Sequence, residues 1–176
     1  MKNNNGVVYE TITVLAIHIL NASEMPFEKD GTELLQRYQR FLLDCAKIMI
    51  QESKCMDFMI GNNCICSIYA GRGSSTIKRA MGAAVRIENL MERLNCKNTY
   101  DSLERIIMGI GIASGTAAMF KMNGNEKEKG KCVWIGPVME KADDLSRAAI
   151  RNGERRIMAE NKLYEIIRDI INRENI

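Results

Sequence analysis

Two side chains capable of chemistry stand at the ends of short hydrophobic segments. His18, the only histidine, ends one apolar run, and Asn62 follows another in the sequence Gly61-Asn62-Asn63. An imidazole can act as a general base or bind a soft metal, and a carboxamide can contact a ligand. Neither supplies the hard anionic oxygen that Mg²⁺ prefers. The plainer interpretations are a hydrogen-bonded core histidine and an ordinary polar turn.

A second set of such side chains lies on a predicted helix further along the chain. Glu140, Asp143 and Asp144 could hold a cation or contact a basic partner. Acidic residues near the start of a helix also stabilise its dipole, which is the simpler explanation. Lys141 and Arg147 on the same helix could meet an anion, and a solvated helix face again explains them more simply.

The composition favours a single domain, because 176 residues can bury a substantial core without disulfides or metals. The 25 basic and 22 acidic residues are interspersed, and a net charge of +3 with no basic block argues against nucleic-acid binding. No apolar run approaches the roughly 20 residues of a membrane-spanning helix. The start of the chain has no signal-peptide pattern, so we expect a cytoplasmic protein that is not bound to a membrane.

Six cysteines stand at positions 45, 55, 64, 66, 96 and 132, with no Cys-x-x-Cys pair. We therefore expect reduced, mostly buried thiols, no zinc site and no cofactor. Cys64 and Cys66 alternate along a predicted strand and would face the same side of it. Twelve methionines suit either an irregular core or an adaptable protein-binding face.

Hydrophobic periodicity divides the chain into short strands and amphipathic helices. The predicted elements are a strand within 7–20, a helix over 33–52, strands over 56–60 and 64–69, a helix over 76–94, strands over 105–113 and 116–122, a charged hairpin over 123–131, a strand over 131–135, a helix over 138–151, a strand over 156–160 and a helix over 162–171. The order β-α-β-β-α-β with further C-terminal elements predicts a ferredoxin-like α+β sandwich. We assign residues 1–10 to a polar tail and 11–176 to one domain.

These strands and their hairpin, together with Gly111-Ile112-Ala113-Ser114-Gly115 and Trp134-Ile135-Gly136-Pro137-Val138, resemble the class III nucleotidyl cyclase catalytic domain, the adenylate and guanylate cyclase homology domain. The resemblance covers about residues 11 to 165. It implies a head-to-tail dimer with two pockets at the subunit interface. In the family, one protomer supplies two aspartates that bind two metal ions, and the other supplies an asparagine and an arginine that orient and neutralise the nucleotide.

The residues at the positions implied by this resemblance are of other types. The metal-binding aspartates correspond to His18 and Asn62. The base-reading lysine corresponds to Phe58, which is most simply a core residue, and its polar partner corresponds to Val133.

The transition-state residues of the family also have no counterpart here. The asparagine corresponds to Met139 or Glu140 and the arginine to Asp143 or Asp144, depending on a shift of one residue. An aspartate in place of an arginine reverses the charge beside the triphosphate. One like-charge pair at about 4 Å costs on the order of 4 kcal/mol at an effective dielectric constant near 20.

Our first hypothesis is therefore a catalytically silent cyclase-homology domain that acts by association, as a homodimer or with another protein. A second hypothesis is an active, divergent nucleotidyl cyclase that uses Mg²⁺ or Mn²⁺ and other acids, such as Asp57, Glu140 or Asp144. A third is a sensor that binds a nucleotide or another small molecule without turnover. The sequence leaves open whether the cleft beside His18 accepts a nucleotide.

Overall fold

A computed structural model describes residues 6–20, 32–61, 63–96, 105–122, 132–152 and 156–174. Its elements are β1 Val7–Ile19, α1 Thr32–Ile50, β2 Cys55–Ile60, β3 Cys64–Ala70, α2 Ser74–Cys96, β4 Met108–Lys121, β5 Cys132–Ile135, α3 Pro137–Asn152, β6 Ile157–Ala159 and α4 Asn161–Glu174. The elements from β1 to β4 have the predicted β-α-β-β-α-β order, and the rest are the C-terminal additions. The predicted ferredoxin-like α+β class is confirmed.

The described strands form one six-stranded sheet in the order β2-β3-β1-β4-β5, with β6 paired to β4 off this path. β1 lies at the centre and pairs antiparallel with both β3 and β4. All residues of β1 from Ile12 to Ile19 are buried, as the continuous apolar end of this strand predicts for a central position. His18 therefore lies at the buried end of a central strand that is paired along both edges.

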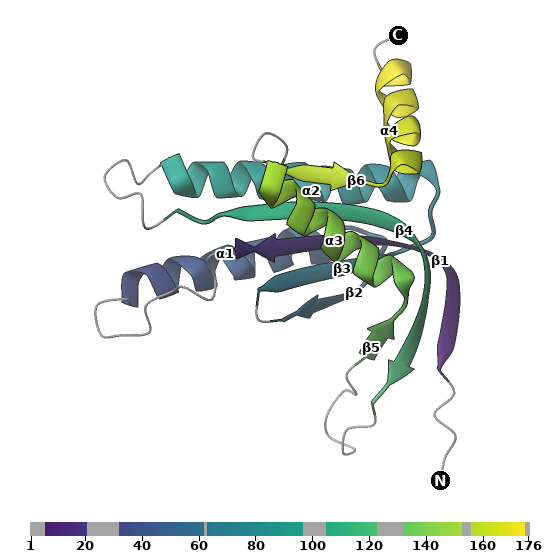
Figure 1. Cartoon of the computed structure of the whole chain (residues 1–176), viewed down its shortest axis with the longest axis horizontal. Helices are drawn as coiled ribbons and strands as arrows, with labels where there is room; N and C mark the ends of the chain where they lie inside the picture. Colours follow the sequence, from purple (N-terminus) through teal and green to yellow (C-terminus); the bar gives the residue numbers. More distant parts are fainter. Residues whose placement is uncertain are drawn as a thin grey trace.

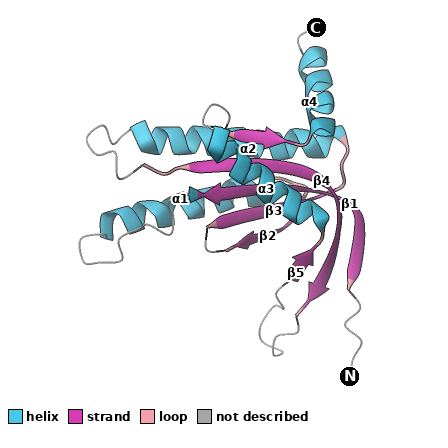
Figure 2. Cartoon of the chain, in the orientation of Figure 1, coloured by secondary structure: helices cyan, strands magenta, loops and turns pink. Residues whose placement is uncertain are grey.

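Helices cover both faces of the sheet (Figure 1; Figure 2). Leu15 and Ile17 of β1 pack on one side with residues of α1, α2 and α4, and we call this side the α1–α2 face. Val14 and Ala16 pack on the other side with residues of α3, and we call it the α3 face. Because side chains alternate along a strand, His18 belongs to the α3 face.

Two glycines let α3 lie close to the sheet. Gly109 pairs with His18 and Gly111 with Ala16, so both occupy the α3 face of β4. A Cβ atom added at Gly111 would overlap the carbonyl oxygen of Ala142, and one added at Gly109 would overlap that of Ser146. The absence of side chains at these positions therefore sets the height and line of α3 above β1.

The structure corrects the prediction that Ser114 and Gly115 separate two strands. β4 runs through both residues without interruption. Gly115 pairs with Ile12, and the Ser114 hydroxyl lies 2.9 Å from that of Thr13. The ladder is irregular in β1 instead, just before Ile12, so the bend falls on the partner strand.

The polar tail is shorter than the range 1–10 assigned to it. β1 begins at Val7, because its first residues pair with the end of β4 and place Val7 opposite Met119. This end of β1, the end of β4 and β5 project away from the helices, and we call them the arm (Figure 1). The predicted hairpin over 123–131 lies outside the described residues, and so does Asn62.

Candidate functional site

His18 lies beneath α3 with its ring almost fully enclosed. Its side chain is 8% exposed, and its Nδ1 atom lies 3.9 Å from Oδ1 of Asp143. Both atoms are buried, and neither has a hydrogen-bond partner among the described residues. Buried polar atoms of this kind are rare in folded proteins, because each loses its bonds to water without replacement. The resemblance had related both positions to the family's active site, and α3 brings them together.

The charge on Asp143 already has a partner. Its other oxygen, Oδ2, accepts a hydrogen bond of 2.9 Å from Nε of Arg147, one helical turn further along α3. Burial lowers the pKa of His18, and the Arg147 guanidinium lowers it further, while the Asp143 carboxylate opposes both. The imidazole is therefore held in its neutral form more strongly than a free histidine.

Two thiols border the same place from β3. Cys64 pairs with His18 and Cys66 with Ala16 in the β1–β3 ladder, and the two sulfur atoms lie 3.4 Å apart. The contact with Cys66, burial and the nearby Asp143 carboxylate together raise the pKa of the Cys64 thiol. Both cysteines pack against the α3-face core while remaining partly exposed, and they face the same side of β3, as predicted.

The two positions that the resemblance relates to recognition of the base lie on β2 and β5, at opposite ends of the strand order. Phe58 is 37% exposed on β2, and Val133 is partly buried on β5. The residues next to them in the sequence are in contact. Nε1 of Trp134 donates a hydrogen bond of 2.7 Å to Oδ2 of Asp57. Sequence reasoning missed this link, although a sole tryptophan beside an expected site was a signal for it.

The remaining predicted site residues lie on opposite sides of α3. Met139 is partly buried and packs against the α3-face core, one turn before Asp143. Glu140 and Asp144 are exposed on the other side of α3. Whichever register relates α3 to the family, the side chains differ from an asparagine and an arginine.

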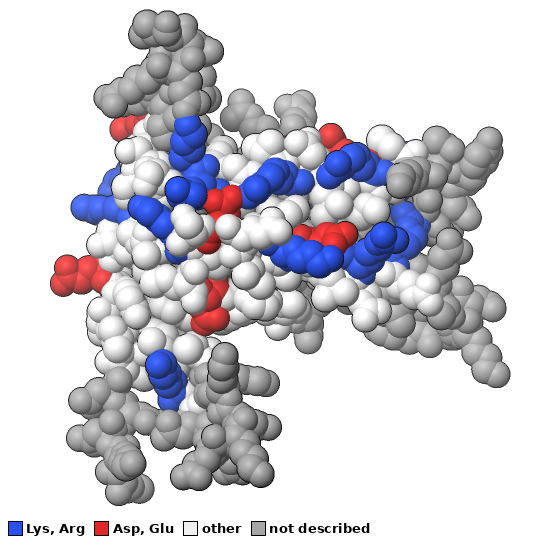
Figure 3. Space-filling model, turned by 180° about the vertical axis from the view of Figure 1, so that it is seen from behind, with Lys and Arg blue, Asp and Glu red and all other residues white. Residues whose placement is uncertain are grey.

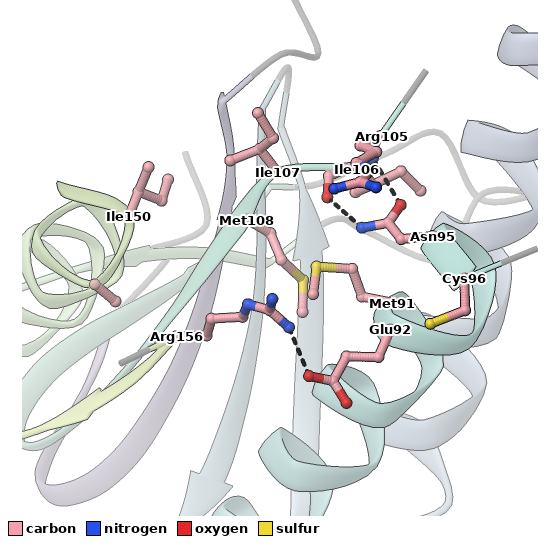
Figure 4. Close-up of a pocket in the computed structure, with 11 residues that line it drawn as sticks. Met91, Glu92, Asn95, Cys96, Arg105, Ile106, Ile107, Met108, Ile150 and Arg156 are labelled. Carbon is pink, nitrogen blue, oxygen red and sulfur yellow. Dashed lines mark hydrogen bonds and ion pairs between the residues drawn. The ribbon is translucent and has the colours of Figure 1, made fainter. Parts of the chain in front are cut away.

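A pocket of about 750 Å³ lies elsewhere, between α2, the start of β4, α3 and β6 (Figure 4). Met91 and Met108 contribute to its apolar wall. Arg156 at its rim donates a hydrogen bond of 2.8 Å to Glu92, so this cation is already paired. The pocket contains none of the residues related to the family's active site.

The face behind the sheet, over α1 and α2, carries mixed charge. Lys and Arg side chains are interleaved there with acids (Figure 3). Glu52, for example, pairs with both Arg79 and Arg86. Within the described part of the chain, no three His, Cys, Asp or Glu side chains are arranged to hold a metal ion. No described helix is long and apolar enough to cross a membrane.

Comparison with known proteins places this geometry in context. No protein-family model matches the chain. The chain is 20% identical over 165 residues to a protein named uridylate cyclase from Treponema porcinum. The match covers 94% of this chain but only 58% of that protein, so the chain spans little more than half of this relative.

Several solved cyclase structures share the fold. The guanylyl cyclase Cya2 superposes with a TM-score of 0.67 at 17% identity, covering 92% of this chain and 79% of that one. The adenylyl cyclase CyaB from P. aeruginosa superposes with a TM-score of 0.67 at 15% identity, covering 94% and 84%.

A guanylyl cyclase domain of Blastocladiella emersonii, which has been solved as a dimer, superposes with a TM-score of 0.65 at 15% identity, covering 93% of this chain and 86% of that one. At such low identities the likeness concerns the fold. The resemblance predicted from the motifs is thus confirmed at that level, and the chain has the fold of the adenylate and guanylate cyclase homology domain.

Proposed function

We propose that this chain is a catalytically silent cyclase-homology domain that acts by association. The observation that carries the proposal is the environment of His18, at the position related to the first metal-binding aspartate. A neutral imidazole occupies the end of β1, and the carboxylate beside it, that of Asp143, is already paired with Arg147.

This environment opposes the family's chemistry. Attack of a ribose hydroxyl on the α-phosphate needs divalent ions to activate the hydroxyl and to neutralise developing charge. Mg²⁺ favours carboxylate oxygens in octahedral geometry, and an imidazole is a poor substitute. Asp143 could offer such an ion only its Oδ1 atom, because Oδ2 accepts the hydrogen bond from Arg147, and the positive charge of that guanidinium would oppose the ion.

Exposed apolar side chains on the arm support association. Val8 is 65% exposed and Ile135 is 59% exposed, on strands that project beyond the helices. Apolar groups gathered on a projecting surface are typical of contact with another protein. We take the partner to be a second copy of the chain, as the resemblance implies.

The second candidate is an active cyclase, and the similarity to a protein named uridylate cyclase favours it. A uridine nucleotide would then be the substrate to examine first. Glu140 and Asp144 are exposed and could contribute carboxylates across a dimer interface. Asp57 is less suited to this, because Trp134 and the backbone N–H of Phe58 occupy its two oxygens.

Incubation of the purified chain with each of the four nucleoside triphosphates and Mg²⁺ or Mn²⁺ separates the candidates. The silent domain gives neither cyclic product nor a change in Tm, whereas a sensor gives a higher Tm without product. Cyclic product above that of a heat-denatured sample would overturn the proposal. The double variant His18→Asp with Asn62→Asp should stay inactive, since the asparagine and arginine would still be missing.

Association is tested by sedimentation of the native chain and of two matched variants. Ile135→Lys places a charge on the arm and should shift the chain from dimer to monomer. Ile50→Lys, at the end of α1 and 54% exposed, changes the same residue type away from the arm and should leave the dimer intact. A native chain that remains monomeric at all concentrations would contradict association with a second copy.

A further inference from the structure

The edge of β4 that faces away from β1 is only partly covered. β6 has three residues and pairs with Ile110 to Ile112, and the carbonyl of Arg156 accepts a hydrogen bond of 2.7 Å from the N–H of Ile110. Four residues earlier, the Asn95 carboxamide accepts a bond of 3.0 Å from the N–H of Ile106 and donates one of 2.9 Å to its carbonyl. The edge between these two contacts is about 13 Å long, at about 3.3 Å per residue.

Met108 lies midway along this uncovered edge. Ile106 and Ile110 direct backbone polar groups to the edge, and a strand repeats every two residues, so those of Met108 point the same way. Its partner in β1, Ile19, donates its N–H to Asn63 on the other side. Among the residues that the structure describes, no hydrogen bond joins the N–H or C=O of Met108 to another residue. Met108 is 3% exposed, and buried backbone groups are nearly always paired, so a bound group or water is expected there.

The pocket of about 750 Å³ lies beside this edge (Figure 4). Met91 of α2 lines it from the α1–α2 side, and Ala149 and Ile150 of α3 line it from the other side. Apolar side chains thus lie above and below the line on which the sheet would continue. A pocket of this size with apolar walls and a few polar groups is typical of a small-molecule site.

We propose that this pocket binds a small, flat molecule that carries a lactam edge, an N–H beside a C=O, on an apolar ring. The C=O of the lactam would accept from the N–H of Met108, and its N–H would donate to the C=O of Met108. Asn95 already makes this pair of bonds with Ile106, two residues away on the same edge. The thioethers of Met91 and Met108 are suited to contact with a ring.

The surroundings favour a small molecule over an added strand. The uncovered edge offers the backbone groups of one residue, whereas a strand pairs over several. At the rim, Arg156 and Glu92 pair with each other and are 41% and 52% exposed. Such an exposed ion pair contributes little and can open to admit a ligand. The pocket contains neither His18 nor any residue of the arm, so the inference goes beyond the proposed function.

Titration of the native chain, isotope-labelled at its methionine methyl groups, with the bicyclic lactam carbostyril tests the site by NMR. We expect saturable shifts of the Met91 and Met108 methyl signals. N-methylcarbostyril keeps the rings and the C=O but lacks the N–H. It should bind about tenfold more weakly, because the C=O of Met108 then stays unpaired. Equal affinities for the two compounds, or no shift with either because the space holds water alone, would overturn the assignment.

Matched variants of α3 locate the site. Ala149→Leu fills part of the pocket, whereas Ala148→Leu makes the same change at the preceding position, which does not line it. The first should weaken carbostyril binding by about tenfold or more, and the second should leave it unchanged. The emission of Trp134 reports whether each variant is folded. Ile150→Trp, at a half-buried position, fills the pocket from its rim and replaces Ala149→Leu if that variant unfolds. Native affinity in a folded pocket-filling variant would place the compound elsewhere and overturn the assignment.

Discussion

The two faces of the sheet bury polar groups in different ways. On the α1–α2 side, the Ser67 hydroxyl donates to the Tyr69 hydroxyl, and Thr76 donates to the carbonyl of Ala70. On the α3 face, His18 and Asp143 each keep a buried atom without a partner in the described residues. The α3 face also contains satisfied polar groups, such as the indole N–H of Trp134, so the difference lies in these two atoms.

The difference has a consequence for stability. A buried polar atom without a partner costs about 1–3 kcal/mol. The α1–α2 face consists of a dense apolar core that holds the sheet together. The α3 face gives up some of that stability at His18 and Asp143, two positions that the resemblance relates to the family's active site.

The largest expected effect concerns the apolar face. Phe41 of α1 is completely buried in the α1–α2 core, so Phe41→Ala should lower the free energy of unfolding by about 3–5 kcal/mol. Urea denaturation followed by circular dichroism measures this. Phe120→Ala, at a side chain that is 40% exposed on the arm, should cost clearly less. Equal losses would show that the α1–α2 core does not dominate the stability.

A smaller effect is expected where α3 meets the sheet. Gly111→Ala would force α3 away from β4, because the new methyl group meets backbone atoms that cannot rotate aside. We expect a loss of about 2–3 kcal/mol. Gly82→Ala in α2 is the matched control, since nothing lies within 4 Å of the added carbon, and it should stabilise the helix by about 0.5–1 kcal/mol. A neutral Gly111→Ala would mean that α3 is not seated as described.

The link between Asp57 and Trp134 should make a more modest contribution. Asp57→Ala leaves the indole N–H without its acceptor and should cost about 1–2 kcal/mol. The emission of Trp134, the only tryptophan, should shift at the same time. Asp57→Asn retains an acceptor oxygen, so its free energy of unfolding should lie between those of the native chain and Asp57→Ala. An Asp57→Ala variant with native emission would contradict the contact.

The smallest expected effect is a dependence of the stability on pH. The pKa of His18 is lowered below its ordinary value of 6.5, so the unfolded chain binds a proton more readily than the folded chain. The contribution of neutral His18 to the stability of the folded chain is complete above pH 6.5 and is lost as the pH falls toward the lowered pKa. Unfolding should therefore become easier as the pH falls below 6.5.

The matched variant His18→Gln should remove this slope, and Asp143→Asn should depress the pKa further, because the carboxylate opposes the shift. Proton NMR of the single histidine measures the pKa directly. A pKa above 6.5 in the native chain would contradict the buried geometry.

Much of the architecture could be predicted because local patterns carry it. The apolar end of β1, the Gly61-Asn62-Asn63 hairpin and the periodicity of α2 each reflect interactions between near neighbours in the chain. The division of β4 at Ser114 and Gly115 was wrong because the pairing partner decides where a ladder bends. Local turn chemistry cannot report that.

The candidate site was predictable only in part. Residue types at 18 and 62 were enough to question Mg²⁺ binding, because side-chain chemistry is a property of the sequence. The contact between His18 and Asp143 was not predictable. The resemblance relates these two positions to halves of the pocket that different protomers supply. In this chain they meet within one protomer, because α3 lies over the end of β1.

The sequence by itself determined the order of the elements, the residue types at the two positions that the resemblance relates to metal-binding aspartates, and the alternation that places Cys64 and Cys66 on one side. The tertiary structure alone decided that His18 lies opposite Cys64 and that Asp143 lies above His18. Proximity between distant segments depends on strand register and on the height of a helix above a sheet. Here β3 sets the first, and Gly109 and Gly111 set the second.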